Sequence, residues 1–326
     1  MFESKQAYYH RGGPRKRSIQ MVRDMLIARG LLASYSPKLV LLANDHSHFQ
    51  RMMMAACRLA GIKVAYIQHA SVSSKFPRLS VDYALLDGRK SLEIYERCMS
   101  NTAPNSCINQ EPKVILSGLK RPINVSGNGI GRGIGIATNN LDNLDKLEAL
   151  SHDLLRLGHE VIFRRHPRQD KKEIENLAGR LSMHDNSIYI SDPQEESVTD
   201  FLRNVSSVIA GDSGILLEAA LAQRAPFYFK TDDTVEHDYY GFVADGIART
   251  VDSAGEVSEL IEQAWRPPSL PMRRLSSTWG TKWFGNEACL LAETLSMILK
   301  DIPLTNVYEI GEASPIATSV YELPTL

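Results

Sequence analysis

The chain has 326 residues, of which 43% are hydrophobic and 23% charged, and its net charge is −1. This length predicts about two domains of an ordinary globular protein, and the near-neutral charge argues against a dedicated nucleic-acid-binding protein. The four cysteines form no CxxC pair, the N-terminus has no signal-peptide pattern, and no apolar run approaches membrane-spanning length, so we expect a cytoplasmic protein whose membrane association, if any, is peripheral.

Residues 1–125 are expected to form a first Rossmann-like domain. A basic stretch at 11–17 has the composition of a solvated arm, with contact to a membrane or to phosphate as the alternative. Residues 18–32 have the apolar spacing of a helix. Further helices are expected at 49–60 and 91–99, between buried strands at 39–43, 63–67, 81–86 and 114–116. This order predicts a parallel sheet that helices cover on both faces.

A second domain is expected at 133–270, after a linker at 120–132 that is rich in Gly, Pro and Asn. Its expected strands are 133–137, 160–163, 188–190, 208–210, 226–229 and 248–251, with helices between them. Residues 271–300 are predicted to include a helix that crosses back onto the first domain. Residues 301–326 are predicted to be a poorly ordered tail.

A cluster of hydrogen-bond donors follows the strand at 160–163. Arg164, Arg165 and His166 stand at the strand's carboxyl end, where open α/β sheets bind their ligands. Guanidinium and imidazole groups suit phosphate oxygens, and Pro167 stiffens the turn. A surface loop with incidental charge is the alternative.

A second anion-binding pattern follows the strand at 208–210. Ser213 and the free backbone N–H groups of the next helix start form an anion site, and Gly211 and Gly214 allow a ligand to approach the backbone. Glu218, one turn further on, could accept hydrogen bonds from ribose hydroxyls. Simple helix capping by Asp212 and Ser213 has the same geometry. Together the two loops predict a site for a phosphate-bearing ligand.

On these motifs the chain resembles GT-B glycosyltransferases, over roughly residues 37–265. The likeness is to bacterial capsule and lipopolysaccharide enzymes with an HP motif, which include sialyltransferases, Kdo transferases and CDP-glycerol glycerophosphotransferases. It is carried by His166-Pro167, by Asp212-Ser213-Gly214 and by Glu218-Ala219. The resemblance implies an α/β, GT-B-like fold with two Rossmann-like domains whose parallel sheets face a central cleft. It also implies that His166 and Ser213 hold the phosphates of a nucleotide-activated donor, CMP- or CDP-linked.

The first domain adds a second likeness. The segment Tyr66-Ile67-Gln68-His69-Ala70 resembles the QHG segment of the same enzymes, with Ala70 in place of the usual glycine. GT-B N-terminal domains usually begin with a strand, whereas this chain begins with a polar arm and a helix. We therefore expect this acceptor-side domain to be shortened.

Two positions in the first domain are candidates for the general base that transfer requires. Histidine titrates near neutral pH, which favours His69 or His46. Asp45 could itself be the base or could orient His46, and capping of the next helix by Asp45 and Ser47 is the alternative. His46 and His48 are unconvincing zinc ligands, and the donor half has no DxD pair. We therefore expect no metal and an inverting displacement.

Four further residues are candidates for contacts in the cleft. Gln68 precedes His69, and Thr138 and Asn139 follow the first strand of the second domain. Tyr240 lies in an aromatic loop that could flank the base or the sugar, or could pack on its own domain.

The resemblance and these residues predict a glycosyltransferase. Its substrates would be a nucleotide-sugar donor and a glycan or glycolipid acceptor, a bacterial surface polysaccharide or lipopolysaccharide, with no cofactor and no nucleic-acid partner. Two alternatives remain, an enzyme similar to UDP-N-acetylglucosamine 2-epimerases and a non-catalytic nucleotide-binding partner subunit.

Overall fold

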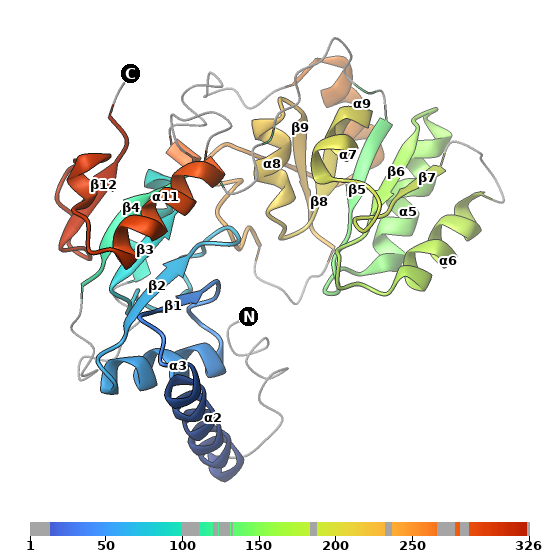
Figure 1. The fold of residues 1–326 in the computed structure, drawn as a ribbon. Coiled ribbons are helices and arrows are strands. Elements are labelled where there is room, and N and C mark those ends of the chain that lie inside the picture. The colour runs from blue at the N-terminus through green and yellow to red at the C-terminus, as the bar shows by residue number, and fades with distance from the viewer. Residues whose placement is uncertain are drawn as a thin grey trace. The chain divides into compact units, whose positions relative to one another are not determined.

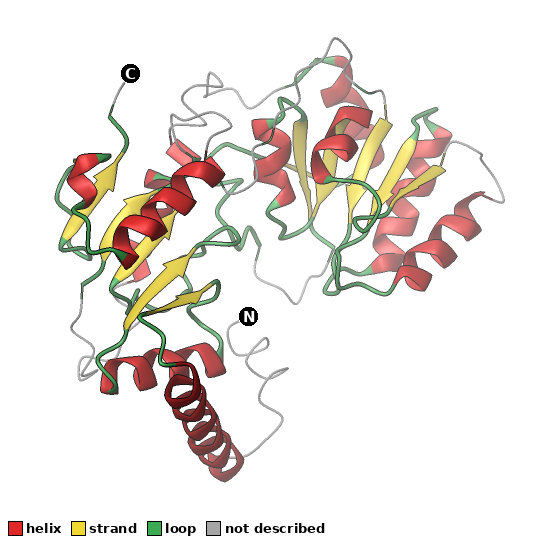
Figure 2. Ribbon diagram, in the orientation of Figure 1, coloured by secondary structure: helices red, strands yellow, loops and turns green. Residues whose placement is uncertain are grey.

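The structure is a computed structural model that describes residues 14–98, 111–119, 123, 131, 133–182, 188–231, 237–265, 278–280 and 287–324. The chain divides into two compact units. The first unit comprises residues 1–122 and 273–326, and the second comprises residues 123–272. Each contains one six-stranded sheet with helices packed on it, so the α/β class expected from the sequence is confirmed (Figures 1 and 2).

The sheet of the first unit has the strand order β1-β2-β3-β4-β12-β11. All neighbouring strands are parallel except β11 and β12, which are antiparallel. The strands are β1 (Leu39–Leu42), β2 (Lys63–Ile67), β3 (Tyr83–Leu86), β4 (Lys113–Leu116), β11 (Glu309–Ile310) and β12 (Ser319–Glu322). The helices are α2 (Pro14–Tyr35), α3 (His48–Leu59), α4 (Arg89–Arg97) and α11 (Glu287–Leu299), with a 3₁₀ turn, η2, at Leu304–Asn306.

The C-terminal residues differ from the tail that the sequence predicted. β12 pairs in parallel with β4, and Val320 and Tyr321 are buried. Arg89 of α4 also donates a hydrogen bond of 2.7 Å to Glu322. The apolar side chains of this short strand are buried only because a distant strand, β4, accepts it as a neighbour. The apolar pattern of these four residues is too short to predict a buried strand from the local sequence alone.

Helix α11 packs on this sheet, and Figure 1 shows it running alongside the strands in orange-red. Leu290, Met297 and Ile298 of the helix form one cluster with Leu85 and Ile115 of the strands. The helix predicted within 271–300 therefore belongs to the first unit's core. Among the described residues, no helix combines the length and the apolar character that a membrane span needs.

The sheet of the second unit has the order β10-β9-β8-β5-β6-β7, and all its strands are parallel. The strands are β5 (Gly133–Ala137), β6 (Val161–Arg164), β7 (Ile188–Ser191), β8 (Val205–Ala210), β9 (Ala225–Phe229) and β10 (Arg249–Val251). The helices are α5 (Leu144–Arg156), α6 (Lys171–Ser182), α7 (Val198–Asn204), α8 (Ile215–Leu221) and α9 (Ala254–Glu262). They lie on both faces of the sheet, as a parallel sheet requires (Figure 2).

A close approach of α7 to β5 fixes part of this packing. A Cβ atom added at Gly135 would lie 2.5 Å from the ring of Phe201, so only glycine lets α7 pack at this depth. The core on one face of this sheet includes Ile134, Phe163 and Phe227, all fully buried. The core thereby holds the ends of β5, β6 and β8 in fixed positions.

Candidate functional site

The strand order of the second unit places a topological switch point between β5 and β8. These two strands are neighbours, and the connections that leave them lead to opposite edges of the sheet, toward β6 and β9. Loops that diverge in this way leave a crevice at the carboxyl ends of the strands, which is where open α/β sheets bind ligands. The segment that follows β5 begins at Thr138, and the segment that follows β8 begins at Gly211.

The two arginines after Phe163 make internal contacts. Arg164 donates to Ser191 Oγ at 2.5 Å and to the carbonyl of Glu196 at 3.0 Å. Arg165 donates to Asp192 Oδ1 at 2.7 Å. Both side chains are buried, and these hydrogen bonds hold the segment after β7 in place. The phosphate contact predicted for them stays a prediction. Acidic residues after the next strand, in the stretch 192–196, were the sequence signal for this internal pairing.

His166 lies exposed at the turn after these arginines. Its Nδ1 accepts a hydrogen bond of 3.2 Å from the backbone N–H of Arg168, so the neutral ring carries its proton on Nε2. Partial burial and the nearby charge of Arg168 lower the pKa of His166, which keeps the ring neutral near pH 7. The imidazole is therefore a neutral hydrogen-bond donor at the carboxyl end of β6.

Thr138 shapes this turn from the neighbouring strand. Its hydroxyl donates to Gln169 Oε1 at 2.6 Å, and the same oxygen accepts from the N–H of His166 at 3.3 Å. Thr138 and Gln169 are both buried. Thr138, predicted as a cleft contact, therefore acts on the position of His166 through Gln169.

The turn after β8 presents backbone donors. Within the described part of the chain, the N–H groups of Ser213 and Gly214 have no hydrogen-bond acceptor, and α8 begins at the next residue. Ser213 Oγ makes only a long contact of 3.5 Å to the N–H of Ile215. Asp212 accepts a hydrogen bond of 2.7 Å from the N–H of Tyr239. Ser213 and Gly214 thus present donors where the sequence predicted an anion site, and anion binding stays a prediction. Asp212 fastens this turn to the loop at 237–246.

Glu218 lies half-buried on α8, one turn beyond Gly214. Its negative charge acts on the guanidinium of Arg164 and partly offsets the effect of burial, which lowers the pKa of that arginine. The charge of Glu218 therefore balances a buried cation beneath the site. The ribose contact predicted for it stays a prediction.

Asp142, which the sequence analysis did not single out, lies against the same turn. Its carboxylate accepts from Thr231 Oγ1 at 2.8 Å and from the N–H of Asn139 at 2.8 Å. A Cβ atom at Gly211 would lie 2.9 Å from Asp142 Oδ1, so the glycine is needed for this contact. Burial raises the pKa of Asp142 to about 6, and the charge of Asp212 adds to the effect. The polar run 138–143 directly after a buried strand was the available signal.

Asn139 and Tyr240 were both predicted as cleft contacts. The side chain of Asn139 accepts from the N–H of Leu141 at 2.8 Å and so forms the turn after β5. The ring of Tyr240 stacks on Phe242 at a centroid distance of 5.6 Å and meets Tyr239 edge-on at 5.2 Å. Burial raises the pKa of Tyr240 to about 12, so its hydroxyl stays protonated. These aromatic rings pack in the loop that Asp212 fastens to the turn after β8.

The first unit brings Asp45 and His46 together at the carboxyl end of β1. Asp45 is 1% exposed, and its Oδ1 lies 3.0 Å from His46 Nδ1. Its Oδ2 accepts a hydrogen bond of 2.9 Å from Tyr95 Oη. Both carboxylate oxygens are hydrogen-bonded, and this geometry favours the alternative in which Asp45 orients His46. The exposed ring of His46 also packs on Phe76 at a centroid distance of 4.4 Å.

The helix-capping alternative for Asp45 and Ser47 does not hold. Ser47 is the N-cap residue of α3 but makes no capping hydrogen bond with its side chain. Asn44 Oδ1 instead accepts from the backbone N–H groups of His46 and Ser47, at 3.0 and 2.7 Å. His48 lies 2.8 Å from Asp24 and joins α3 to α2. Of these two histidines, His48 links two helices, whereas His46 is exposed and paired with a buried carboxylate, as a catalytic histidine would be.

The remaining candidates lie after β2, the neighbour of β1. Gln68 is buried and bridges two loops, because its Oε1 accepts from the N–H of Asp87 at 3.0 Å and its Nε2 donates to the carbonyl of Ala70 at 3.1 Å. Gln68 is therefore a structural residue. His69 is exposed at the end of this strand. In the part of the chain that the structure describes, no group of three or more His, Cys, Asp or Glu residues is placed to hold a metal ion.

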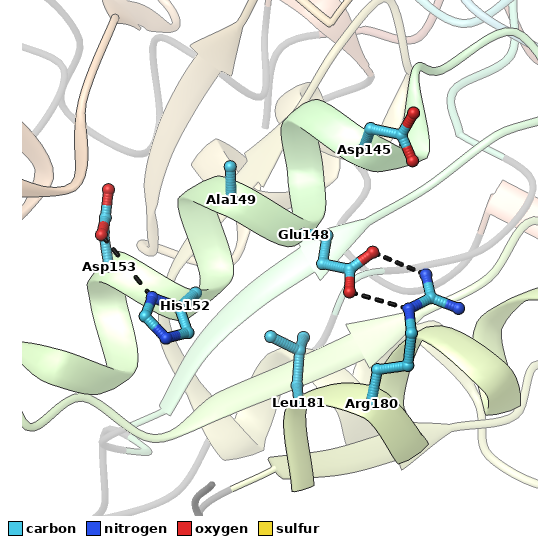
Figure 3. A pocket seen from close by; sticks show the side chains of 7 residues that line it. All are labelled: Asp145, Glu148, Ala149, His152, Asp153, Arg180 and Leu181. Atoms are coloured by element: carbon cyan, nitrogen blue, oxygen red, sulfur yellow. Dashed lines mark hydrogen bonds and ion pairs between the residues drawn. The ribbon is translucent and has the colours of Figure 1, made fainter. Parts of the chain in front are cut away.

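A surface pocket lies elsewhere on the second unit, between α5 and α6 (Figure 3). Glu148 and Arg180 face each other across it through two hydrogen bonds of 2.8 and 2.5 Å. Its lining, Asp145, Glu148, Ala149, His152, Asp153, Arg180 and Leu181, includes no residue of the turns described above. We therefore interpret this pocket as a surface depression between two helices that the Glu148–Arg180 ion pair links, and not as part of the candidate site.

Comparisons with known protein families and with curated proteins gave no match. Among solved structures, MnaA of S. aureus in complex with UDP is similar to this chain, with a TM-score of 0.57 and 11% identity over 88% of this chain and 82% of that one. The UDP-GlcNAc 2-epimerase of Methanocaldococcus jannaschii, in complex with UDP-GlcNAc and UDP, has a TM-score of 0.53 and 15% identity over 89% and 82% of the two chains. MurG of Acinetobacter baumannii has a TM-score of 0.50 and 12% identity over 86% and 79%. These similarities show that the chain has the GT-B fold, as the sequence resemblance predicted.

Proposed function

We propose that this protein is a glycosyltransferase that uses a nucleotide-sugar donor. The observation that carries the proposal is the placement of two kinds of donor at the carboxyl edge of one sheet. After β8 stand the backbone N–H groups of Ser213 and Gly214, which have no acceptor among the described residues, and after β6 stands the neutral donor His166. Such an arrangement suits the phosphates of a nucleotide, because backbone dipoles and a neutral imidazole stabilise negative charge without competing counter-ions. Two of the similar structures hold UDP, which supports a nucleotide ligand.

The proposed general base is His46. It donates its Nδ1 proton to Asp45, so the lone pair lies on Nε2, where the long contact of 3.4 Å from Asn44 Nδ2 gives way to the proton of an acceptor hydroxyl. The acceptor oxygen then forms a bond to the anomeric carbon as the bond from that carbon to the phosphate oxygen breaks. The negative charge that develops on the departing nucleotide is stabilised by Ser213, Gly214 and His166. A single displacement of this kind inverts the anomeric carbon and needs no metal or cofactor.

We also propose a cytidine-type donor and a bacterial surface polysaccharide or lipopolysaccharide acceptor, met at the inner face of the cytoplasmic membrane. Both rest on the resemblance of the HP turn at His166-Pro167 to capsule and lipopolysaccharide enzymes. The UDP bound in the similar structures makes a uridine nucleotide the alternative donor.

The first test is a thermal-shift panel of CMP, CDP, UDP and GDP. A nucleotide at 100 times its Kd stabilises the folded protein by about 2.7 kcal/mol, so the donor class should appear as one selective rise in Tm. His166→Asn should abolish that rise, whereas His152→Asn, at the exposed pocket between α5 and α6, should not. Absence of a rise with every nucleotide would remove the phosphate-site assignment.

A second candidate function is epimerisation of a nucleotide sugar, which the similarity to UDP-GlcNAc 2-epimerases favours. Incubation of the protein with its donor and no acceptor separates the two reactions. Formation of an epimer would support the epimerase, whereas transfer only in the presence of an acceptor, lost in His46→Gln, supports the proposal. Nucleotide binding with neither reaction would identify a non-catalytic subunit.

A further inference from the structure

Behind the Asp45–His46 pair lies a chain of buried hydroxyl groups that the proposed reaction does not itself use. Tyr95 Oη lies 2.9 Å from Asp45 Oδ2 and 3.2 Å from Tyr66 Oη. Tyr95 is fully buried, and Tyr66 is 2% exposed. The two rings meet edge-on, at a centroid distance of 6.3 Å and an interplanar angle of 84°. Side chains from two separate elements of the first unit, α4 and β2, therefore form a chain that ends at the carboxylate of Asp45, after β1.

Proton counting fixes the direction of this chain. A phenol has one proton, and the carboxylate can only accept, so Tyr95 donates to Asp45. The Tyr95 oxygen then accepts the proton of Tyr66. Asp45 receives the second donor, His46 Nδ1, on its other oxygen at 3.0 Å. Each hydrogen bond in the sequence from Tyr66 to Tyr95 to Asp45 polarises the next and strengthens it.

The environment keeps both phenols protonated. Burial raises the pKa of Tyr66 and that of Tyr95, and the negative charge of Asp45 raises both further. A buried carboxylate also needs hydrogen-bond donors to offset its loss of water. Because its pKa is raised, the Tyr95 hydroxyl keeps its proton and remains a hydrogen-bond donor to the Asp45 carboxylate.

Arg51 of α3 gives Asp45 an alternative partner. Its charge interacts with Asp45, and its Nη1 atom is buried without a hydrogen-bond partner among the described residues. If Asp45 Oδ2 lost the phenol proton, the carboxylate could turn toward this guanidinium. His46 would then lose the fixed acceptor of its Nδ1 proton.

We propose that Tyr95 is the positioning residue of this site, and that it holds Asp45 in the orientation that fixes the ring and the tautomer of His46. Tyr66 supports Tyr95 from behind and has the smaller effect. The inference rests on the proposed function for its meaning in catalysis, but the coupling of Tyr95 to His46 is a property of the protein without substrate.

The test uses Tyr95→Phe, which removes one oxygen and keeps the ring. Long-range ¹H–¹⁵N spectra of the full chain report the His46 tautomer, with the His46 signals assigned from His46→Gln. We expect the wild type to show the Nδ1–H form and Tyr95→Phe to show a mixture of the two tautomers. Tyr308→Phe is the matched control, because Tyr308 is a buried phenol of the same unit whose hydroxyl pairs with Thr294, and it should leave the His46 signals unchanged.

Kinetics give a second readout. Tyr95→Phe should lower kcat on the order of tenfold, as expected for groups that orient a functional histidine, with KM for the donor unchanged. Unchanged His46 signals in a folded Tyr95→Phe variant would overturn the inference. If that variant does not fold, Tyr66→Phe is used in its place. A smaller shift of the His46 signals toward the second tautomer is expected there, and no shift at all would overturn the coupling of the hydroxyl chain to His46. A His46→Gln variant with full transfer activity would instead refute the proposed base and leave the tautomer result to stand on its own.

Discussion

The two units of this protein contain sheets of equal size but are assembled differently. The second unit is one continuous stretch, residues 123–272, and its strands are all parallel. The first unit needs two distant stretches, because β12 near the C-terminus extends the sheet that β1 to β4 begin. In a continuous α/β stretch, each strand and helix can be predicted from neighbouring residues, whereas β12 is buried only by pairing with a strand far away in the sequence. The fold of the first unit is therefore harder to predict, and loss of the C-terminal residues should unfold it more readily.

The units also differ at their surfaces. In the first unit β1 is an edge strand, Leu41 is 48% exposed, and α2 leaves Ile19, Val22 and Leu26 more than half exposed. In the second unit the candidate site lies at the sheet's centre, between β5 and β8, where neighbouring strands fix both turns. The turns of the candidate site therefore follow interior strands of their sheet, whereas the edge strand β7 of the same sheet exposes Tyr189 and Ile190.

Removal of residues 304–326 should have the largest effect and should separate the units. It takes away buried Leu304, Tyr308, Val320 and Tyr321, so β4 and α11 lose the apolar surface that they pack against. We expect the first unit to unfold while the second stays folded. Hydrogen exchange measured by mass spectrometry should show lost protection in peptides from residues 39–116 and retained protection in peptides from 133–265. Glu309→Ala, at an exposed position of β11, is the control, and protection in both units of the truncated chain would show that the returning strand is dispensable.

Exchange of Arg165 for Met should have the next largest effect and should be confined to the second unit. It removes donors to Asp192 Oδ1 and to the carbonyl of Gln169, at 2.7 and 3.2 Å, in a buried environment. We expect the Tm of that unit to fall by roughly 5 °C. His166→Asn, at the exposed neighbouring position, should keep the Tm and lose only the nucleotide-induced rise. A normal Tm in Arg165→Met, with nucleotide response lost, would restore the phosphate-binding role first expected for this arginine.

The pH dependence of the second unit should reveal Asp142. Burial raises its pKa from 3.8 to about 6 in the folded state. Between these values the folded state binds more protons than the unfolded state, so stability falls as pH rises through this window, and the loss is complete above the folded pKa. Asp142→Asn should flatten this slope. Comparison of Tm between pH 4 and pH 7 in wild type and variant tests it, because other carboxyl groups contribute equally to both. If Tm changed equally with pH in wild type and Asp142→Asn, the pKa of Asp142 would not be raised by burial.

The turns of the second unit could be predicted because each follows a strand within the same local stretch. Gly211, Ser213 and Gly214 had a recognisable order, and the position of His166 after a strand was enough to place it at the sheet's ligand edge. The ion pairs of the two arginines before it were not predicted. The acidic residues in the stretch 192–196 were visible in the sequence, but only the fold shows that Asp192 and Glu196 lie beside Arg165 and Arg164.

The site in the first unit was predicted only in part. Asp45 and His46 stand next to each other in the chain, so their pairing was foreseeable. Tyr66 and Tyr95 belong to separate elements, and nothing in their local patterns distinguishes them from ordinary core aromatic residues. A contact made by residues 50 positions apart, such as Asp45 and Tyr95, requires the fold.

The smallest effect is expected on the outward face of α2. Leu26 is 63% exposed, so Leu26→Gln should change the free energy of unfolding by no more than about 0.5 kcal/mol. Leu32, at 7% exposure on the face that packs against α3, is the matched position, and Leu32→Ala should cost about 2–3 kcal/mol. Urea denaturation of both variants measures the difference. A loss in Leu26→Gln as large as that in Leu32→Ala would mean that both faces of α2 are covered in solution, and the exposed apolar face that sets α2 apart from the helices of the second unit would then disappear.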